Sequence, residues 1–317
     1  MEIERVAERS QRVVVEVEKA IIGKRNLLRQ IMTAVLAGGH VLLEDYPGLG
    51  KTLLANSFAT ALGLAFKRIQ FTPDLLPGDI TGGYVFNRAS GEFELRTGPL
   101  FANIVLADEI NRASPKTQSA LLEAMQEYQV TLEGETMPLP RPFLVLATQN
   151  PIEYEGTFPL PEAQLDRFLM KLSVGYPTPA EEQEILRLRR ERQQDEVSLK
   201  PITNAEELAD MRRAIEQVYI EPDIEQYMVA LVSATRKDSR IAVGASPRAS
   251  LAFMKLARAW AVLDGRSFVI PDDVKQFIQP VLAHRLLLQP DLWMKRNAAQ
   301  DVIQKVTSAV PVPVIEV

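Results

Sequence analysis

The chain contains no cysteine and only two histidines. Without cysteine it can form neither disulfides nor thiolate zinc sites, and it has no cysteine nucleophile. This composition fits a reducing compartment, so we expect a cytoplasmic protein. His40 and His284 do not form a pair with metal-ligand spacing and are expected to be structural, and no Ser-His-Asp arrangement is suggested.

Long apolar runs and an excess of positive charge are also missing. No run approaches the roughly 18 residues of a membrane span, so membrane insertion is not expected. The segment from Met1 to Arg5 is charged and lacks the apolar core of a signal peptide. The net charge of −5 argues against a nucleic-acid partner. A basic run at 187–192 is interleaved with glutamates, which favours a solvated helix face.

The 317 residues leave room for two domains. Up to about residue 176, short apolar segments alternate with helix-like segments. The apolar segments predict strands over 41–45, 66–71, 102–108, 143–149 and 168–174. Segments such as 104–107 are apolar at every position, which is typical of a parallel sheet covered on both faces. The sequence therefore predicts an α/β fold with a five-stranded parallel sheet. Two helices, broken at 22–24, are expected before it.

The composition changes after residue 178, where the pattern becomes almost entirely helical. Helices are expected to begin at Asn204, at Pro222, at Pro247 and at Pro271, with a connector over 194–203. We therefore expect two domains, residues 1–178 and residues 179–317. Within the first, the segments 84–95 and 130–139 each carry a glycine-bearing turn between β-prone arms and are interpreted as inserted β-hairpins.

The most informative segment reads EDYPGLGKT, from Glu44 to Thr52. A glycine-bearing turn between a strand and a helix, closed by Gly-Lys-Thr, is the arrangement that cradles a nucleoside triphosphate. Lys51 would reach the terminal phosphates, and the Thr52 hydroxyl would bind Mg²⁺. The first glycine of the general pattern is replaced by Asp45. The alternative is an ordinary strand-turn-helix that happens to contain Gly-Lys-Thr. The predicted nucleotide contacts are Pro47, Gly48, Leu49, Gly50, Lys51, Thr52 and Leu53.

Two further strands are predicted to end in polar residues. Asp108 and Glu109 follow an apolar strand, where Asp108 would hold the Mg²⁺ shell and Glu109 would orient or deprotonate the attacking water. The alternative is a pair of acids facing solvent. Asn150 follows the next strand, where it could bind the water or the γ-phosphate, or simply serve as a turn residue before Pro151. Together with the glycine-rich turn, the two acids indicate hydrolysis of ATP.

Five segments of the chain form a joint pattern: Tyr46–Thr52, Leu106–Ala113, Ala120–Met125, Ala147–Pro151 and Gln164–Phe168. In this pattern the chain closely resembles MoxR-type AAA+ ATPases, and the resemblance covers nearly its whole length. The resemblance implies a P-loop AAA+ core with a C-terminal all-helical lid, ATP and Mg²⁺ as cofactors, and hairpins that face a central pore or a client.

The resemblance also implies roles that local patterns leave open. Asn150 corresponds to the sensor 1 residue, and Arg167 corresponds to the arginine finger that reaches the neighbouring subunit's nucleotide. Taken by itself, Arg167 could instead pair with Glu162 or lie in a cap near Asp166. Ile22 and Gly23 are expected to line the adenine pocket, with Tyr176 near it.

Arg248 corresponds to the sensor 2 arginine of the lid. Ser246 is expected to be an N-cap and Pro247 the first helical residue, which places Arg248 in the first turn of a helix. The helix dipole disfavours a cation there by roughly 0.3–1 kcal/mol, which a nearby phosphate would offset. An exposed arginine without a role is the alternative. Arg112 is expected to contact an adjacent subunit or to pair with an acid.

The expected function is an ATP-hydrolysing AAA+ machine that remodels or activates protein complexes. The family implies self-association into a ring, expected to be a hexamer, and a client that carries a von Willebrand factor A domain. A nucleic-acid-stimulated motor or loader is the alternative, against which the acidic net charge counts. A nucleotide-switched scaffold without hydrolysis is a third possibility, against which Asp108, Glu109 and Arg167 count.

Overall fold

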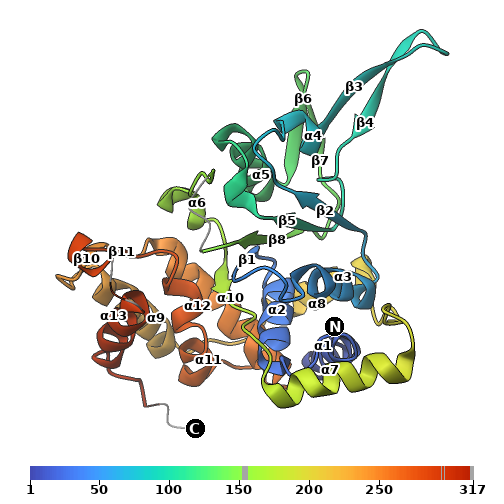
Figure 1. The fold of residues 1–317 in the computed structure, drawn as a ribbon. Coiled ribbons are helices and arrows are strands. Elements are labelled where there is room, and N and C mark those ends of the chain that lie inside the picture. The colour runs from blue at the N-terminus through green and yellow to red at the C-terminus, as the bar shows by residue number, and fades with distance from the viewer. Residues whose placement is uncertain (152–155, 294, 296, 315–317) are drawn as a thin grey trace.

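The computed structural model describes residues 1–151, 156–293, 295 and 297–314. Its centre is a parallel sheet of five strands in the order β2-β5-β8-β1-β9 (Figure 1). The predicted α/β class and the five predicted strands are confirmed. The strands are β1 (Val41–Glu44), β2 (Phe66–Gln70), β5 (Ile104–Asp108), β8 (Leu144–Gln149) and β9 (Met170–Leu172).

Helices cover both faces of the sheet because successive strand residues point to opposite sides. In β1, Val41 and Leu43 join one apolar cluster, whereas Leu42 joins the other. The first cluster includes side chains of α1 (Ile3–Glu18), α2 (Arg25–Ala37) and α3 (Lys51–Leu62). The second includes those of α5 (Pro115–Glu127). This alternation explains why the strand segments are apolar at every position.

Two β-hairpins interrupt the alternation of strands and helices, as predicted. The first, β3 (Gly82–Asn87) and β4 (Glu92–Thr97), follows the short helix α4 (Pro77–Thr81) and projects far from the body (Figure 1). The second consists of β6 (Gln129–Leu132) and β7 (Glu135–Pro138). The Tyr84 hydroxyl donates a hydrogen bond of 2.9 Å to Glu135, which ties the two hairpins together.

The C-terminal part is helical apart from a short antiparallel ribbon of β10 (Ile241–Val243) and β11 (Leu287–Leu288). The ribbon is an addition to the expected fold. It forms because Ile241 and Leu288 bury their side chains together against α13. None of the described helices is long and apolar enough to cross a bilayer. The helices are α6 (Glu162–Leu165), which precedes β9, then α7 (Pro179–Arg192), α8 (Ala205–Ile215), α9 (Pro222–Thr235), α10 (Pro247–Leu263), α11 (Pro271–Lys275), α12 (Ile278–Leu282) and α13 (Ala298–Ser308); 3₁₀ turns lie at Ile110–Arg112 and Pro290–Leu292.

The predicted helix starts are confirmed by their caps. The Asn204 side chain accepts a hydrogen bond from Glu207 N–H, and the Ser246 hydroxyl accepts one from Arg248 N–H. Prolines occupy the first position of α9, α10 and α11. A proline costs little there because its missing N–H would have no partner within the helix.

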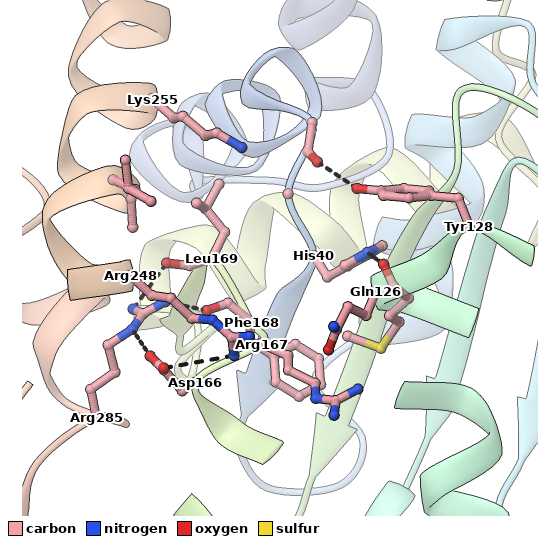
Figure 2. A pocket seen from close by; sticks show the side chains of 15 residues that line it. His40, Gln126, Tyr128, Asp166, Arg167, Phe168, Leu169, Arg248, Lys255 and Arg285 are labelled. Carbon is pink, nitrogen blue, oxygen red and sulfur yellow. Dashed lines mark hydrogen bonds and ion pairs between the residues drawn. The ribbon is translucent and has the colours of Figure 1, made fainter. Parts of the chain in front are cut away.

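His40 lies just before β1 and is fully structural. Its Nδ1 accepts the Val145 N–H at 3.0 Å, so the proton must reside on Nε2, which lies 2.9 Å from the Met125 carbonyl oxygen (Figure 2). Burial lowers the pKa of His40 to about 4. The ring therefore stays neutral near pH 7 and fixes the start of β1 to both β8 and α5.

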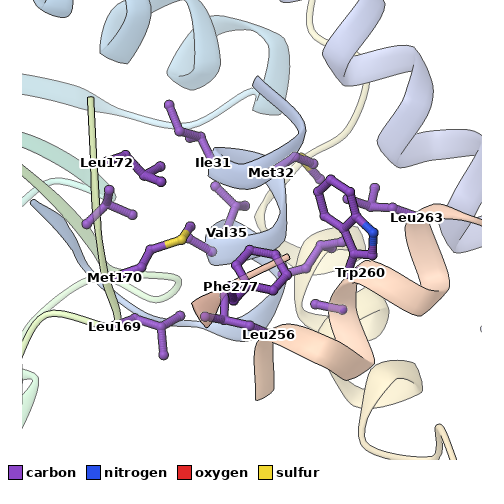
Figure 3. Close-up of a cluster of buried hydrophobic side chains, with 14 of the residues drawn as sticks. Ile31, Met32, Val35, Leu169, Met170, Leu172, Leu256, Trp260, Leu263 and Phe277 are labelled. Carbon is purple, nitrogen blue, oxygen red and sulfur yellow. The ribbon is translucent and has the colours of Figure 1, made fainter. Parts of the chain in front are cut away.

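A single apolar cluster joins the sheet, the N-terminal helices and the C-terminal helices. Figure 3 shows side chains of α2, β9 and α10 converging on Phe277, with Trp260 packed edge-on against it at 5.4 Å. Helix α10 also packs against α1. The C-terminal helices are thus attached to the core through buried apolar surface, which is the dominant stabilising term in folding.

Lowering the pH should destabilise the fold through His40. Because the pKa of His40 drops from 6.5 to about 4 on folding, the unfolded chain binds a proton that the folded chain does not. We expect the free energy of unfolding to fall by about 2–3 kcal/mol between pH 7 and pH 4 from this residue. Burial also lowers the pKa of His284, which adds in the same direction.

Urea unfolding at several pH values measures this effect. His40→Asn should be less stable than the wild type near neutral pH, because one amide cannot replace both ring hydrogen bonds. Its stability should also change less steeply as the pH falls below 6.5. An equally steep pH dependence in the variant would show that His40 is not the group responsible.

Candidate functional site

The glycine-rich turn connects the carboxyl end of β1 to the first residue of α3. Gly48 and Gly50 have φ angles of +82° and +75°, and an added Cβ at either position would meet no atom within 4 Å. Glycine is therefore needed for its backbone conformation rather than for space. Helix α3 begins at Lys51. The first N–H groups of a helix lack internal partners, which makes this end a site for an anion.

A cavity of about 260 Å³ lies between this turn and the carboxyl ends of β5 and β8. The Lys51 ammonium donates a hydrogen bond of 2.8 Å to the Asp45 carbonyl oxygen. Burial lowers the pKa of Lys51, an effect that the nearby carboxylates of Asp45, Asp108 and Glu109 oppose. The cavity is lined by Pro47, Gly48, Leu49, Gly50, Lys51, Thr52, Arg68, Asp108, Glu109 and Asn150.

Asp108 ends β5 and is held from two sides. Its Oδ1 accepts the Thr148 hydroxyl at 2.6 Å. Its Oδ2 accepts two hydrogen bonds from Arg68 on the neighbouring strand β2, from Nε at 3.1 Å and from Nη2 at 2.6 Å. Asp108, the carboxylate expected to hold Mg²⁺, thus lies beside the guanidinium of Arg68.

Glu109 turns out of the strand in the left-handed conformation, with φ 57° and ψ 50°. Such a backbone costs a residue other than glycine on the order of 1 kcal/mol, and strain of this kind is concentrated at functional sites. Glu109 N–H donates to the Thr148 hydroxyl. The carboxylate accepts hydrogen bonds from Gln70 at 2.7 Å and from Arg112 at 3.1 Å. Arg112 was expected either to contact an adjacent subunit or to pair with an acid. Within the chain it pairs with an acid, Glu109.

Asp45, the departure from the common pattern, is buried and makes three hydrogen bonds through its side chain. Its carboxylate accepts the N–H of Tyr46 at 2.9 Å, the hydroxyl of Ser173 at 2.8 Å and the N–H of Gly175 at 2.6 Å. These bonds attach the start of the glycine-rich turn to the segment that follows β9. A glycine at this position would leave these donors without the carboxylate.

Three predicted nucleotide contacts, Leu53, Ile22 and Gly23, do not line this cavity. The neighbourhood of Gly23 is connected to the turn through Tyr176. Lys24 donates to the Tyr176 carbonyl oxygen at 2.8 Å, and the Tyr176 ring lies 5.8 Å from that of Tyr46.

Arg167 and Arg248 line a second cavity, of about 240 Å³ (Figure 2). Its wall includes His40, which precedes β1, and Leu169, which precedes β9, so it lies at the amino ends of these strands. The P-loop lies at the carboxyl end of β1. A strand of four residues is about 13 Å long. One chain therefore places the two arginines and its own P-loop at opposite edges of the sheet.

At this second cavity, the Asp166 carboxylate contacts three side chains of the C-terminal helical part. Its carboxylate accepts hydrogen bonds of 2.8 Å from Arg285 Nε and from the Ser246 hydroxyl, and Arg248 Nη1 lies 3.8 Å away. Arg285 is almost fully buried and also donates to backbone carbonyl oxygens. Arg167 donates to the Leu122 carbonyl oxygen at 2.8 Å.

The chain is similar to known proteins over nearly its whole length. Residues 40–170 match the ATPase family associated with various cellular activities, and residues 233–306 match the AAA lid domain. Chaperone MoxR1 of Mycobacterium tuberculosis is 45% identical, with 96% of this chain and 82% of that protein covered. The chain belongs to the MoxR family of AAA+ ATPases.

Two other proteins are similar to this MoxR-family chain over nearly the whole length of both chains. Protein YeaC of Bacillus subtilis is 48% identical, with 96% of this chain and 94% of that protein covered. The crystal structure of a candidate ATPase from Cytophaga hutchinsonii superimposes with a TM-score of 0.91 and 40% identity, with 98% of this chain and 96% of that one covered. The P-loop AAA+ core and the C-terminal lid predicted for this ATPase are thereby confirmed.

Several residues of the site were not predicted from the sequence. Arg68 and Gln70 contact the two carboxylates, and their spacing of two residues near the end of a strand was an available signal. Arg285 carried no such signal, because only tertiary packing brings it to Asp166.

Aspartate at position 45 should stabilise the folded protein more than the glycine of the common pattern would at the same position. Asp45→Gly restores that pattern but removes the acceptor of three hydrogen bonds, so we expect a loss of about 2–4 kcal/mol in the free energy of unfolding. Asp45→Asn, which keeps the shape and one acceptor oxygen, should lose less. Chemical denaturation of the three proteins tests this order, and an Asp45→Gly variant as stable as the wild type would contradict it.

Proposed function

We propose that this MoxR-family ATPase hydrolyses Mg²⁺-ATP in the cavity beside its P-loop, and that each site is completed by the neighbouring subunit of a ring. The observation that supports this proposal is the split between two cavities. Lys51, Asp108 and Glu109 line one cavity, and Arg167 and Arg248 line the other at the opposite edge of the sheet. In a head-to-tail ring, the second cavity of one subunit would face the first cavity of the next.

The residues of the first cavity fit a magnesium nucleotide. Among the described residues no group of three or more His, Cys, Asp or Glu could hold a metal ion. Mg²⁺ is typically bound by one or two protein oxygens together with substrate phosphates and water, and Thr52 and Asp108 supply such oxygens. When bound, the ion would neutralise charge on the phosphates.

Most of the residues expected at the site have a proposed role in the reaction. Backbone N–H groups from Gly48 to Leu53 and the Lys51 ammonium hold the phosphates, and Pro47, which has no N–H, lies at the start of the turn. Glu109 takes the proton of the attacking water, and Asn150 orients that water or the γ-phosphate. Arg167 and Arg248 of the neighbour stabilise negative charge on the transferring phosphoryl group. Ile22 and Gly23 bound the adenine pocket on the side of Tyr46 and Tyr176.

The work driven by hydrolysis is proposed to be remodelling or activation of protein complexes. This proposal is supported by the name of the relative MoxR1, a chaperone. Residues 1–178 act as the nucleotide-binding core and residues 179–317 as the lid, in a cytoplasmic ring expected to hold six subunits. The projecting hairpin exposes Phe86 and Phe93, whose rings are 5.3 Å apart, as a surface for a client. A protein with a von Willebrand factor A domain is the expected client.

Substitutions at Lys51 and Glu109 should separate binding from hydrolysis. Lys51→Ala removes the cation that faces the phosphates and should weaken ATP binding at least about tenfold. Glu109→Gln keeps the shape but cannot accept a proton, so ATP should bind normally while turnover falls at least about 100-fold. Calorimetric binding and phosphate release measure the two effects. An equal loss of binding in both variants would refute the role of Glu109.

Mixed rings test which subunit supplies the arginines. Arg167→Ala and Arg248→Ala should each lower turnover, and mixing either with Lys51→Ala should partly restore it, because some interfaces then combine an intact P-loop with intact arginines. Mixing Arg167→Ala with Arg248→Ala should restore nothing, since every interface lacks one of them. Restored activity in that last mixture would show that Arg248 acts on its own subunit's nucleotide.

A further inference from the structure

Arg68 is the one cation of the first cavity that the proposed mechanism leaves without a role. It stands on β2, and its side chain crosses to Asp108 on the adjacent strand β5. Both Nε and Nη2 donate to the same oxygen, Asp108 Oδ2, and Nη2 also reaches Gln70. The other oxygen, Oδ1, is occupied by Thr148. Arg68 therefore binds Oδ2, the Asp108 oxygen that would otherwise be left to bind a metal ion.

The same guanidinium has access to the position of the phosphates. Arg68 lines the cavity together with Gly50, Lys51 and Thr52, and its side chain is 46% exposed, so it is not fixed by packing. A guanidinium carries five N–H donors, of which Asp108 and Gln70 use the one on Nε and the two on Nη2. It also binds phosphate oxygens more readily than most side chains do.

We propose that Arg68 is a nucleotide-exchange cation: it neutralises Asp108 while the site is empty, and it turns to the terminal phosphate of ATP when Mg²⁺ takes its place at Asp108. This inference rests on the proposed function of the cavity. Arg68 also offsets the cost of keeping the carboxylate of Asp108 largely buried, since an unpaired buried charge is costly. It also gives ATP a contact that ADP, one phosphate shorter, does not make.

Nucleotide binding in a Glu109→Gln background, where ATP stays intact, tests the proposal. In saturating Mg²⁺, Arg68→Gln should weaken ATP binding by about 10- to 100-fold, because a charge-assisted hydrogen bond to the terminal phosphate is lost, and ADP binding much less. The free Mg²⁺ concentration that gives half of the metal-dependent gain in ATP affinity should fall severalfold, because Asp108 no longer has a competing cation. Arg68→Lys keeps the charge and should lie closer to the parent protein in both measurements.

Lys67→Gln is the matched control, because Lys67 lies next to Arg68 on β2, is exposed and does not line the cavity. It should change neither measurement. Equal weakening of ATP and ADP by Arg68→Gln, or an unchanged Mg²⁺ midpoint, would overturn the proposal and leave Arg68 as a support for Asp108. Failure of the proposed function has a different signature, namely that the parent protein binds no ATP or that Lys51→Ala does not weaken its binding.

Discussion

In a parallel sheet all carboxyl ends of the strands lie along one edge and all amino ends along the opposite edge, so the two edges differ chemically. The rest of this structure depends on that constraint. All five strands point the same way, so the P-loop, Asp108, Glu109 and Asn150 emerge together at the carboxyl edge. The connections back to the next strand must cross to the amino edge, which is where Arg167 lies. A single chain can therefore bring the residues of the first cavity together by topology alone, and the same topology separates them from the two arginines.

Charge balance in the first cavity follows from the same crowding. Each of its two carboxylates has a partner from its own chain: Arg68 for Asp108, and Gln70 with Arg112 for Glu109. A carboxylate at a partly buried strand end would otherwise lose hydration without compensation. Because Arg68 and Gln70 stand on β2, which leads through α4 into the projecting hairpin, any change at the two carboxylates acts on the strand that precedes that hairpin.

The sequence predicted the strands and the P-loop well because both rest on local chemistry, namely alternating burial and the glycines that adopt positive φ. It could not predict the partners of Asp45, since Ser173 and Gly175 are distant in sequence and meet it only after β9 pairs with β1. The ribbon of β10 and β11 was missed for a similar reason, as two and three residues are too few for a periodic signal.

Asp166 connects the two domains at the amino edge. Its carboxylate binds Ser246 and Arg285 and lies beside Arg248, all three in the C-terminal helices, while its neighbour in sequence is Arg167. Breaking these contacts would leave Arg285 as an unpaired buried cation, which is costly. Asp166 therefore couples the position of Arg248 to that of the adjacent Arg167. A displacement of the C-terminal helices that carries Arg248 must also act on the segment that holds Arg167, so in the ring proposed above both arginines would shift together.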